Sequence, residues 1–127
     1  MGLITKAEIV AAVDLNFEDV DMPEWGGAVR VSELSAADVL SFWDACRGPG
    51  GELLPDSVQP ALLVRSIVNE KGAPLFSADT VNELMGKSAA AIGRLFGVAK
   101  RLNGIGQHDA AKNSEAVLSG DSPSGSA

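Results

Sequence analysis

The chain has 127 residues, a formal net charge of −7 and 46% hydrophobic residues. This length suits one domain with a single core, and the low aromatic content of 5% predicts a mainly aliphatic core. The acidic balance argues against nucleic acid as a partner, because binding to phosphates requires clustered Lys and Arg. No stretch is apolar enough to span a membrane and the N-terminus does not resemble a signal peptide, so we expect a cytosolic protein with no membrane partner.

The first predicted element is a short helix from Thr5 to about Ala12. The pattern Thr5-x-x-Glu8 is a capping box, in which each residue's side chain binds the backbone N–H of the other. Ile9, Val10 and Val13 supply its apolar residues. Because isolated helices shorter than about 12 residues are marginal in water, we expect this helix to lean on the body of the protein.

A β-hairpin is predicted next. Val20 and Met22 alternate with charged residues, and Val29 and Val31 alternate in the same way, which is the period of a half-buried strand. Residues 23–27 between them, PEWGG, are turn formers. We expect Val20 and Met22 to face inward and to pair with Val29 and Val31. The charged first strand suits the edge of a sheet.

The hairpin leads directly into a predicted helix that ends near Cys46. Ser35 is its expected N-cap, and Leu34 and Val39 occupy the positions of a hydrophobic staple. The helical spacing predicts an apolar face made of Val39, Leu40, Phe42, Trp43 and Cys46. Residues 47–51, RGPGG, stop the helix and predict a loop.

Two further helices are predicted between residues 57 and 86. Pro60 suits the first turn of a helix that runs to about Asn69, with Asp56 or Gln59 as its cap, although the run LLVRSIV also fits a buried strand. A turn at residues 69–74 follows. Ser77 is then the expected cap of a short helix over residues 78–85.

The last predicted helix, Ala89 to Leu102, is the most regular. Ser88 is its expected cap, and Asn103-Gly104 its stop. Its apolar residues recur on one face, so we expect it to be the packing partner of the hairpin.

Together these elements predict an α+β fold: one small, mainly helical domain of four to five helices with one N-terminal β-hairpin, over residues 1–104. Residues 105–127 are rich in Gly, Ser, Asp, Pro and Ala, which predicts a disordered tail. Residues 116–118, AVL, are its only apolar patch.

The inventory of chemically active residues is thin. His108 is the only histidine and lies in the predicted tail, and Cys46 is the only cysteine and suits a helix interior. The acidic residues Glu18, Asp19 and Asp21 lack the pattern of a calcium-binding loop. We therefore predict no catalytic, cofactor or metal site, and favour a binding or assembly protein over an enzyme.

Three blocks of the sequence resemble the tail assembly chaperones of long-tailed, siphovirus-type bacteriophages and their prophages. Val20 to Asp38 contains EWGGAVRV followed by LSAAD, Ile67 to Ser77 reads IVNEKGAPLFS, and Leu84 to Gly104 contains LMGKSAAAIGRLF and the RLNG stop. The blocks span most of the predicted domain and leave out the tail.

The resemblance implies a non-enzymatic protein of the infected host's cytoplasm that uses no cofactor. Such a chaperone coats the long tape measure protein, keeps it soluble, and helps recruit subunits of the major tail tube protein. It is absent from the mature virion. In several of these families a frameshift gives a longer form of the protein. Because coating a long partner requires many copies, we also expect self-association into oligomers.

Five residues are candidates for partner binding: Trp25, Arg30, Trp43, Arg94 and Phe96. Trp25 is equally consistent with covering the core and with contacting a partner, whereas Trp43 is more consistent with a place in the core. The two arginines are also consistent with a solvated surface that binds no partner. The alternative function is a structural or connector subunit that is retained in the phage particle.

Overall fold

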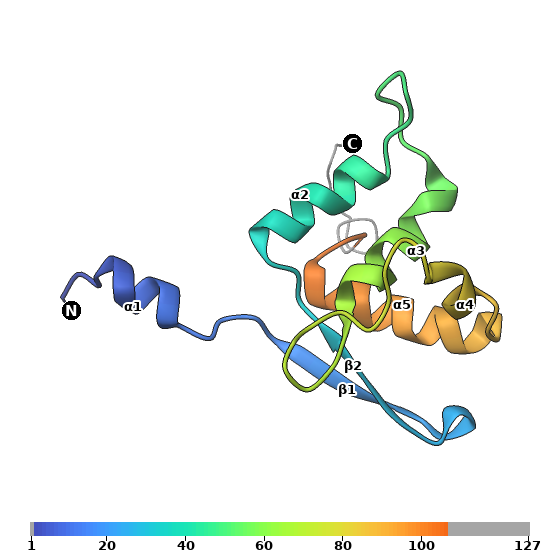
Figure 1. The fold of residues 1–127 in the computed structure, drawn as a ribbon, viewed down its shortest axis with the longest axis horizontal. Coiled ribbons are helices and arrows are strands. Elements are labelled where there is room, and N and C mark those ends of the chain that lie inside the picture. The colour runs from blue at the N-terminus through green and yellow to red at the C-terminus, as the bar shows by residue number, and fades with distance from the viewer. Residues whose placement is uncertain (1, 107–127) are drawn as a thin grey trace, which may run out of the picture.

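The structure, a computed structural model, describes residues 2–106 (Figure 1). In chain order its elements are α1 (Lys6–Ala11), β1 (Phe17–Met22), the 3₁₀ turn η1 (Pro23–Trp25), β2 (Gly27–Ser32), α2 (Ala36–Ala45), α3 (Pro55–Ser66), β3 (Ile67–Val68), α4 (Val81–Met85) and α5 (Ala89–Asn103). The α+β fold with an N-terminal hairpin is confirmed. No helix in the described range is long and apolar enough to cross a membrane.

The hairpin forms two strands of a three-stranded antiparallel sheet. β1 pairs with β2, and β3 adds to the other edge of β2. Gly26 closes the turn with a φ of 84°, a left-handed conformation that a residue without a Cβ adopts at little cost. Val20 lies opposite Val29 as expected, but Met22 lies opposite Gly27 rather than a valine. The turn sets this register, because every pair on the two strands follows from where it closes.

The prediction of a helix through Asn69 was wrong. α3 ends at Ser66, and Ile67 and Val68 are fully or almost fully buried as β3, opposite Val31 and Arg30 of β2. β-branched side chains pack well on a pleated sheet. Pairing with β2, which lies far earlier in the chain, favours a strand over a helix for these two residues.

The start of α3 also differs from the prediction. Pro55 takes the first helical position, no side chain caps the helix, and Pro60 lies inside it. A proline in a helix interior removes one backbone hydrogen bond and costs about 3 kcal/mol. The burial of Leu62 and Leu63 in the same helix opposes this cost.

α4 is shorter than expected. It begins at Val81 rather than Ala78, and Ser77 does not cap it: the Ser77 N–H donates to Thr80 Oγ1 at 2.8 Å. Gly86 ends it as predicted.

The core lies between the sheet and helices α2, α3 and α5. α5 contacts both hairpin strands and α3, and α2 also packs on α3. The expected packing of the hairpin on the last helix is therefore confirmed. The most deeply buried large side chains are Met22, Val31, Phe42, Cys46, Leu62, Leu63, Ile67 and Leu95.

Helix α1 stands away from this core, at the far left of Figure 1. Its capping box forms as predicted: Glu8 N–H donates to Thr5 Oγ1 at 3.2 Å, and Thr5 N–H donates to Glu8 Oε1 at 2.8 Å. None of its residues is buried, so the expectation that it leans on the body was wrong. The local signal forms the helix, although none of its side chains is buried against the domain.

Candidate partner-binding surface

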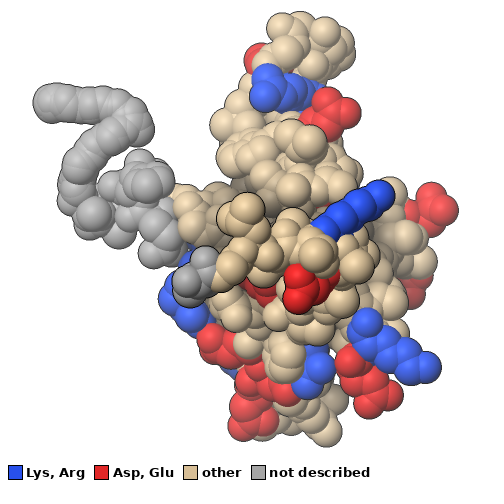
Figure 2. All heavy atoms as spheres, turned by 90° about the vertical axis from the view of Figure 1, so that its left-hand side faces the viewer, with Lys and Arg blue, Asp and Glu red and all other residues tan. Residues whose placement is uncertain are grey.

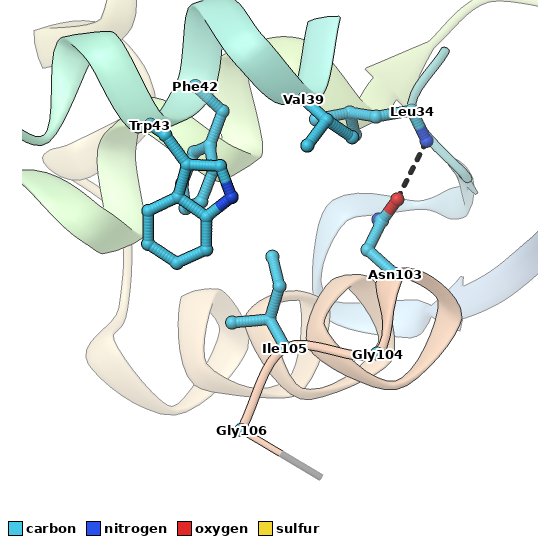
Figure 3. Close-up of a pocket in the computed structure, with 8 residues that line it drawn as sticks. All are labelled: Leu34, Val39, Phe42, Trp43, Asn103, Gly104, Ile105 and Gly106. Atoms are coloured by element: carbon cyan, nitrogen blue, oxygen red, sulfur yellow. Dashed lines mark hydrogen bonds between the residues drawn. The ribbon is translucent and has the colours of Figure 1, made fainter. Parts of the chain in front are cut away.

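A pocket of about 360 Å³ lies between α2 and the end of α5, which we call the α2–α5 pocket (Figure 3). Apolar side chains supply most of its wall, and a short backbone turn supplies the rest. It is lined by Leu34, Val39, Phe42, Trp43, Asn103, Gly104, Ile105 and Gly106. The two predicted staple residues, Leu34 and Val39, therefore belong to its wall.

Asn103 fixes the two sides of this pocket to one another. Its Oδ1 accepts from Leu34 N–H at 2.7 Å, and its Nδ2 donates to the Ala99 carbonyl at 2.9 Å. The first of these bonds joins the end of α5 to the segment that begins α2 (Figure 3). The pocket is thus held by a side-chain amide that uses both its acceptor and its donor.

The turn after Asn103 brings Ile105 into the wall. Gly104 has a φ of 67°, and Ile105 N–H donates back to the Lys100 carbonyl at 2.9 Å, which is a glycine-closed helix end. Ile105 is half-buried and packs against the core, although it belonged to the predicted tail. His108 and residues 116–118 lie outside the described residues.

Trp43 is the exposed aromatic of the pocket. The prediction that it lies in the core was wrong: its exposed fraction is 39%, whereas its neighbour Phe42 is fully buried. The two rings meet edge to face, with 4.8 Å between their centroids. Leu40, on the same helix, is 73% exposed. Of the predicted apolar stripe of α2, Phe42 and Cys46 are therefore fully buried, whereas Leu40 and Trp43 are exposed.

Trp25 and Arg94 lie at the opposite end of the hairpin. Trp25 is half-buried and packs against the core. Arg94 of α5 reaches the hairpin turn and pairs with Glu24, with 2.6 Å between Arg94 Nη2 and Glu24 Oε2. This hydrogen bond from Arg94 lowers the pKa of the Glu24 carboxyl from its ordinary value.

Arg30 lies on the outer face of the sheet. Its guanidinium binds both carboxylate oxygens of Asp19, the Nε to Oδ1 distance being 2.8 Å, and lies 3.9 Å from the centroid of the Phe17 ring. The hydrogen bond from Arg30 lowers the pKa of the Asp19 carboxyl. The same arginine therefore already has an acidic and an aromatic partner within its own sheet.

Phe96 is half-buried on α5, and the Lys100 ammonium lies 4.7 Å from the centroid of its ring. A third ion pair joins Arg101 of the same helix to Glu18 of β1, at 2.6 Å. On the face in Figure 2, acidic and basic side chains lie next to one another rather than in separate patches. Two of the three ion pairs among the described residues thus join acidic residues of the hairpin to basic residues of α5.

The five predicted residues therefore do not form one surface. Trp25 lies in the hairpin turn, and Arg94 reaches the same turn through Glu24. Arg30 lies on the sheet, Phe96 is half-buried on α5, and Trp43 lies in the α2–α5 pocket. The sequence reasoning missed Asn103 and Ile105 as parts of that pocket. Asn103-Gly104 signalled only a helix end, and nothing local indicates that the Asn103 side chain binds a residue so far away in the sequence.

The described residues hold no group of three or more His, Cys, Asp and Glu placed to bind a metal ion. Cys46 is buried, and burial raises the pKa of its thiol. What the arrangement does offer is apolar surface: a pocket with an exposed tryptophan, and exposed leucines at positions 40, 53 and 75.

No family model matches the sequence, and no curated protein matches it. A solved structure does: the tail assembly chaperone of bacteriophage HK97, with a TM-score of 0.52 and 18% identity. The chain shares the fold of this phage chaperone. The match covers 76% of this chain and 94% of the HK97 protein, so nearly the whole fold of the chaperone is present.

Proposed function

We propose that this protein is a tail assembly chaperone of a long-tailed phage or prophage, which binds the tape measure protein and keeps it soluble during tail assembly. The observation that carries the proposal is the fold, which matches 94% of the HK97 tail assembly chaperone. The exposed apolar surface supports it, because a chaperone must offer apolar side chains to a partner that would otherwise aggregate.

The α2–α5 pocket is the proposed contact for the tape measure protein. Such a protein is a long helix with an apolar stripe, and an amphipathic helix binds by placing apolar side chains into a groove. Trp43 presents a large, partly exposed ring at the edge of the pocket, and the Asn103 bonds hold the pocket open without a partner. A preformed pocket lowers the entropy lost on binding.

The proposal includes the later steps of assembly. The chaperone helps recruit subunits of the major tail tube protein, associates with further copies of itself along the tape measure, acts in the cytoplasm of the infected host, and is absent from the mature virion. Trp25, Arg30, Arg94 and Phe96 stay candidate contacts for these partners, with the two arginines available only after their ion pairs open.

Co-expression with the tape measure protein of the same phage tests the proposal. We expect the tape measure protein to be soluble with the wild-type chain and to aggregate without it. Trp43→Ala should reduce the soluble fraction, because truncating a central aromatic commonly weakens binding by about 2 kcal/mol or more. Leu40→Ala is the matched control, on the same helix but outside the pocket. Equal solubility with and without the chain would refute the proposal.

Mass spectrometry of purified virions tests the alternative, a structural or connector subunit. A chaperone that is displaced during assembly should leave no stoichiometric peptides in finished particles. Abundant peptides of this chain in the particle would favour the connector instead.

A further inference from the structure

Among the described residues, those that line the α2–α5 pocket carry no charge. Trp43 is 39% exposed there, and its ring and the half-buried Ile105 side chain face one another in Figure 3. The volume of about 360 Å³ is larger than that of an engineered apolar cavity of about 150 Å³ that binds benzene. The pocket therefore has room for two aliphatic side chains, and an uncharged segment suits it best.

The last described residue, Gly106, lies in the wall of this pocket. Its φ of 75° is a left-handed conformation that glycine adopts at little cost. The hydrogen bond from Ile105 N–H to the Lys100 carbonyl, at 2.9 Å, fixes the backbone just before it. The segment that follows, residues 107–127, therefore starts at the pocket itself.

This segment contains one apolar run, Ala116, Val117 and Leu118, with polar residues or glycine on both sides. Ala116 is ten residues after Gly106. A stretch of this length spans about 35 Å at full extension, so the run can reach back to the pocket from which the segment starts.

The covalent connection makes even a weak contact sufficient. A short linker presents its segment to a site at an effective concentration on the order of millimolar. A contact with a dissociation constant of about 1 mM is then about half formed in each molecule. The same run on a second copy has to be present at a millimolar protein concentration to compete. The pocket's own chain is therefore its favoured occupant when no other partner is present.

Charge favours this pocket over a second groove, of about 500 Å³, between α2 and α3. Asp38 and Asp56 line that groove, and they repel Glu115, which directly precedes the apolar run. Arg65 also lines it, but its guanidinium already donates to Ser41 and to the backbone of its own helix. The groove thus suits the run less well than the uncharged α2–α5 pocket.

Lys100 supplies a cation beside the α2–α5 pocket. It is three residues before Asn103 on α5, so the two are neighbours on the helix surface. Its ammonium lies 4.7 Å from the centroid of the Phe96 ring and has no carboxylate partner among the described residues. Glu115 provides a carboxylate next to the apolar run, which matches this cation.

We propose that residues 116–118 bind in the α2–α5 pocket of their own chain, with Val117 and Leu118 against Trp43 and Glu115 beside Lys100. The run covers the apolar wall while no partner is present, and an apolar helix of a partner displaces it. This inference deepens the proposed function, because it adds regulation to the same site, and it rests on that function only for the identity of the displacing partner.

NMR of the full chain tests the contact. Val117→Asp should shift the indole N–H signal of Trp43 and the amide signal of Ile105, because a charged side chain does not stay in an uncharged pocket. Trp25, in the hairpin turn, is the internal control and should not shift. Ala111→Asp adds the same charge to the same segment outside the run and should leave all three signals in place. Unchanged Trp43 and Ile105 signals in Val117→Asp would overturn the proposal.

A dilution series separates the pocket of the same chain from that of a second copy. The difference between the wild type and Val117→Asp should be the same at every protein concentration, because an intramolecular contact does not depend on it. A difference that vanishes on dilution would place the run on a second copy and contradict the proposal.

Acrylamide quenching measures how far the pocket is covered. In Trp25→Phe, Trp43 is the remaining tryptophan. A run that shields this ring in about half of the molecules halves its collisions with the quencher, so adding Val117→Asp should raise the quenching constant about twofold. Adding Ala111→Asp should leave it unchanged. Trp25→Tyr replaces Trp25→Phe if circular dichroism shows that the latter is unfolded. Equal quenching with and without Val117→Asp would count against the contact.

Charge reversal tests the proposed orientation. Glu115→Lys should move the Trp43 signal toward its position in Val117→Asp, because two like charges then face each other. Combining it with Lys100→Glu should restore the wild-type position. A combined variant that behaves like Glu115→Lys alone would exclude the pairing of Glu115 with Lys100.

The outcomes are separable from those of the proposed function. The NMR and quenching experiments contain no tape measure protein, so their failure leaves the co-expression result unaffected. If both proposals hold, Val117→Asp should bind the tape measure protein about twofold more tightly than the wild type, because a larger fraction of its pockets is open. A tape measure protein that is equally soluble with and without the chain would refute the proposed function and leave the NMR result unaffected.

Discussion

Helices α1 and α5 both begin with a side-chain N-cap, but α1 is exposed and α5 is part of the core. Thr5 and Ser88 each accept a hydrogen bond from the backbone three residues later. Ile9 of α1 is 58% exposed, whereas Ile92 of α5 is 3% exposed. A cap and an apolar pattern therefore decide that a helix forms, but the other elements of the domain decide whether it is buried.

The largest difference between the two helices should be in core stability. Leu95→Ala should lower the free energy of unfolding by about 2–5 kcal/mol, because it leaves a cavity among fully buried side chains. Ile9→Ala should change it by less than about 0.5 kcal/mol. Both are measured by urea denaturation. A large effect of Ile9→Ala would mean that α1 packs on the domain.

A smaller difference is expected for the two caps. Ser88→Ala should lower the free energy of unfolding by about 1 kcal/mol, because α5 is part of the cooperative core. Thr5→Ala should leave the melting temperature unchanged and remove the helical chemical shifts of residues 6–11. Thermal melting and NMR of both variants measure this. Equal losses of melting temperature would contradict the distinction between the exposed helix α1 and the core helix α5.

The smallest difference should appear in the pH dependence of stability. The hydrogen bond from Arg94 lowers the pKa of Glu24 below its ordinary value of 4.5, and hydrogen bonds to Thr5 lower the pKa of Glu8 from the same value. A carboxyl with a lowered pKa in the folded state stabilises the fold above its unfolded pKa, and this stabilisation is lost as the pH falls through the folded pKa.

The wild type should therefore melt above Glu24→Gln at pH 7, and the gap should close as the pH falls below 4.5. Glu8→Gln should have the melting temperature of the wild type at every pH, because Glu8 stabilises only α1. A constant gap for Glu24→Gln would show that its ion pair with Arg94 does not contribute to stability. Melting by circular dichroism from pH 7 to pH 3 measures both.

The features that the sequence predicted well are those set by neighbouring residues. The capping box at Thr5, the cap at Ser35, the hairpin turn and the glycine stop at Gly104 all form as expected. Each depends on side chains within about four residues of the backbone they bind.

The errors come from distant partners or from competition between similar signals. Ile67 and Val68 became a strand because β2 lies beside them. Pro55 and Pro60 both suit a helix start, and the earlier one took it. Trp43 fits the helical stripe of α2, but it lies at the edge of the core and is 39% exposed, whereas Phe42 and Cys46 of the same stripe are fully buried. The α2–α5 pocket was not predictable, because it depends on Asn103 reaching Leu34.

The hydrogen bond between Leu34 and Asn103 also bears on the order of folding. Asn103 and Leu34 are 69 residues apart in the sequence, and the Arg101 to Glu18 pair spans 83 residues. The hairpin is synthesised among the first elements, yet the helix that covers it is among the last. Contacts between such distant residues form slowly, because a long loop must close first. During synthesis α5 can therefore cover the apolar face of the hairpin only after it has left the ribosome, and a chain truncated before Ala89 should lose this cover.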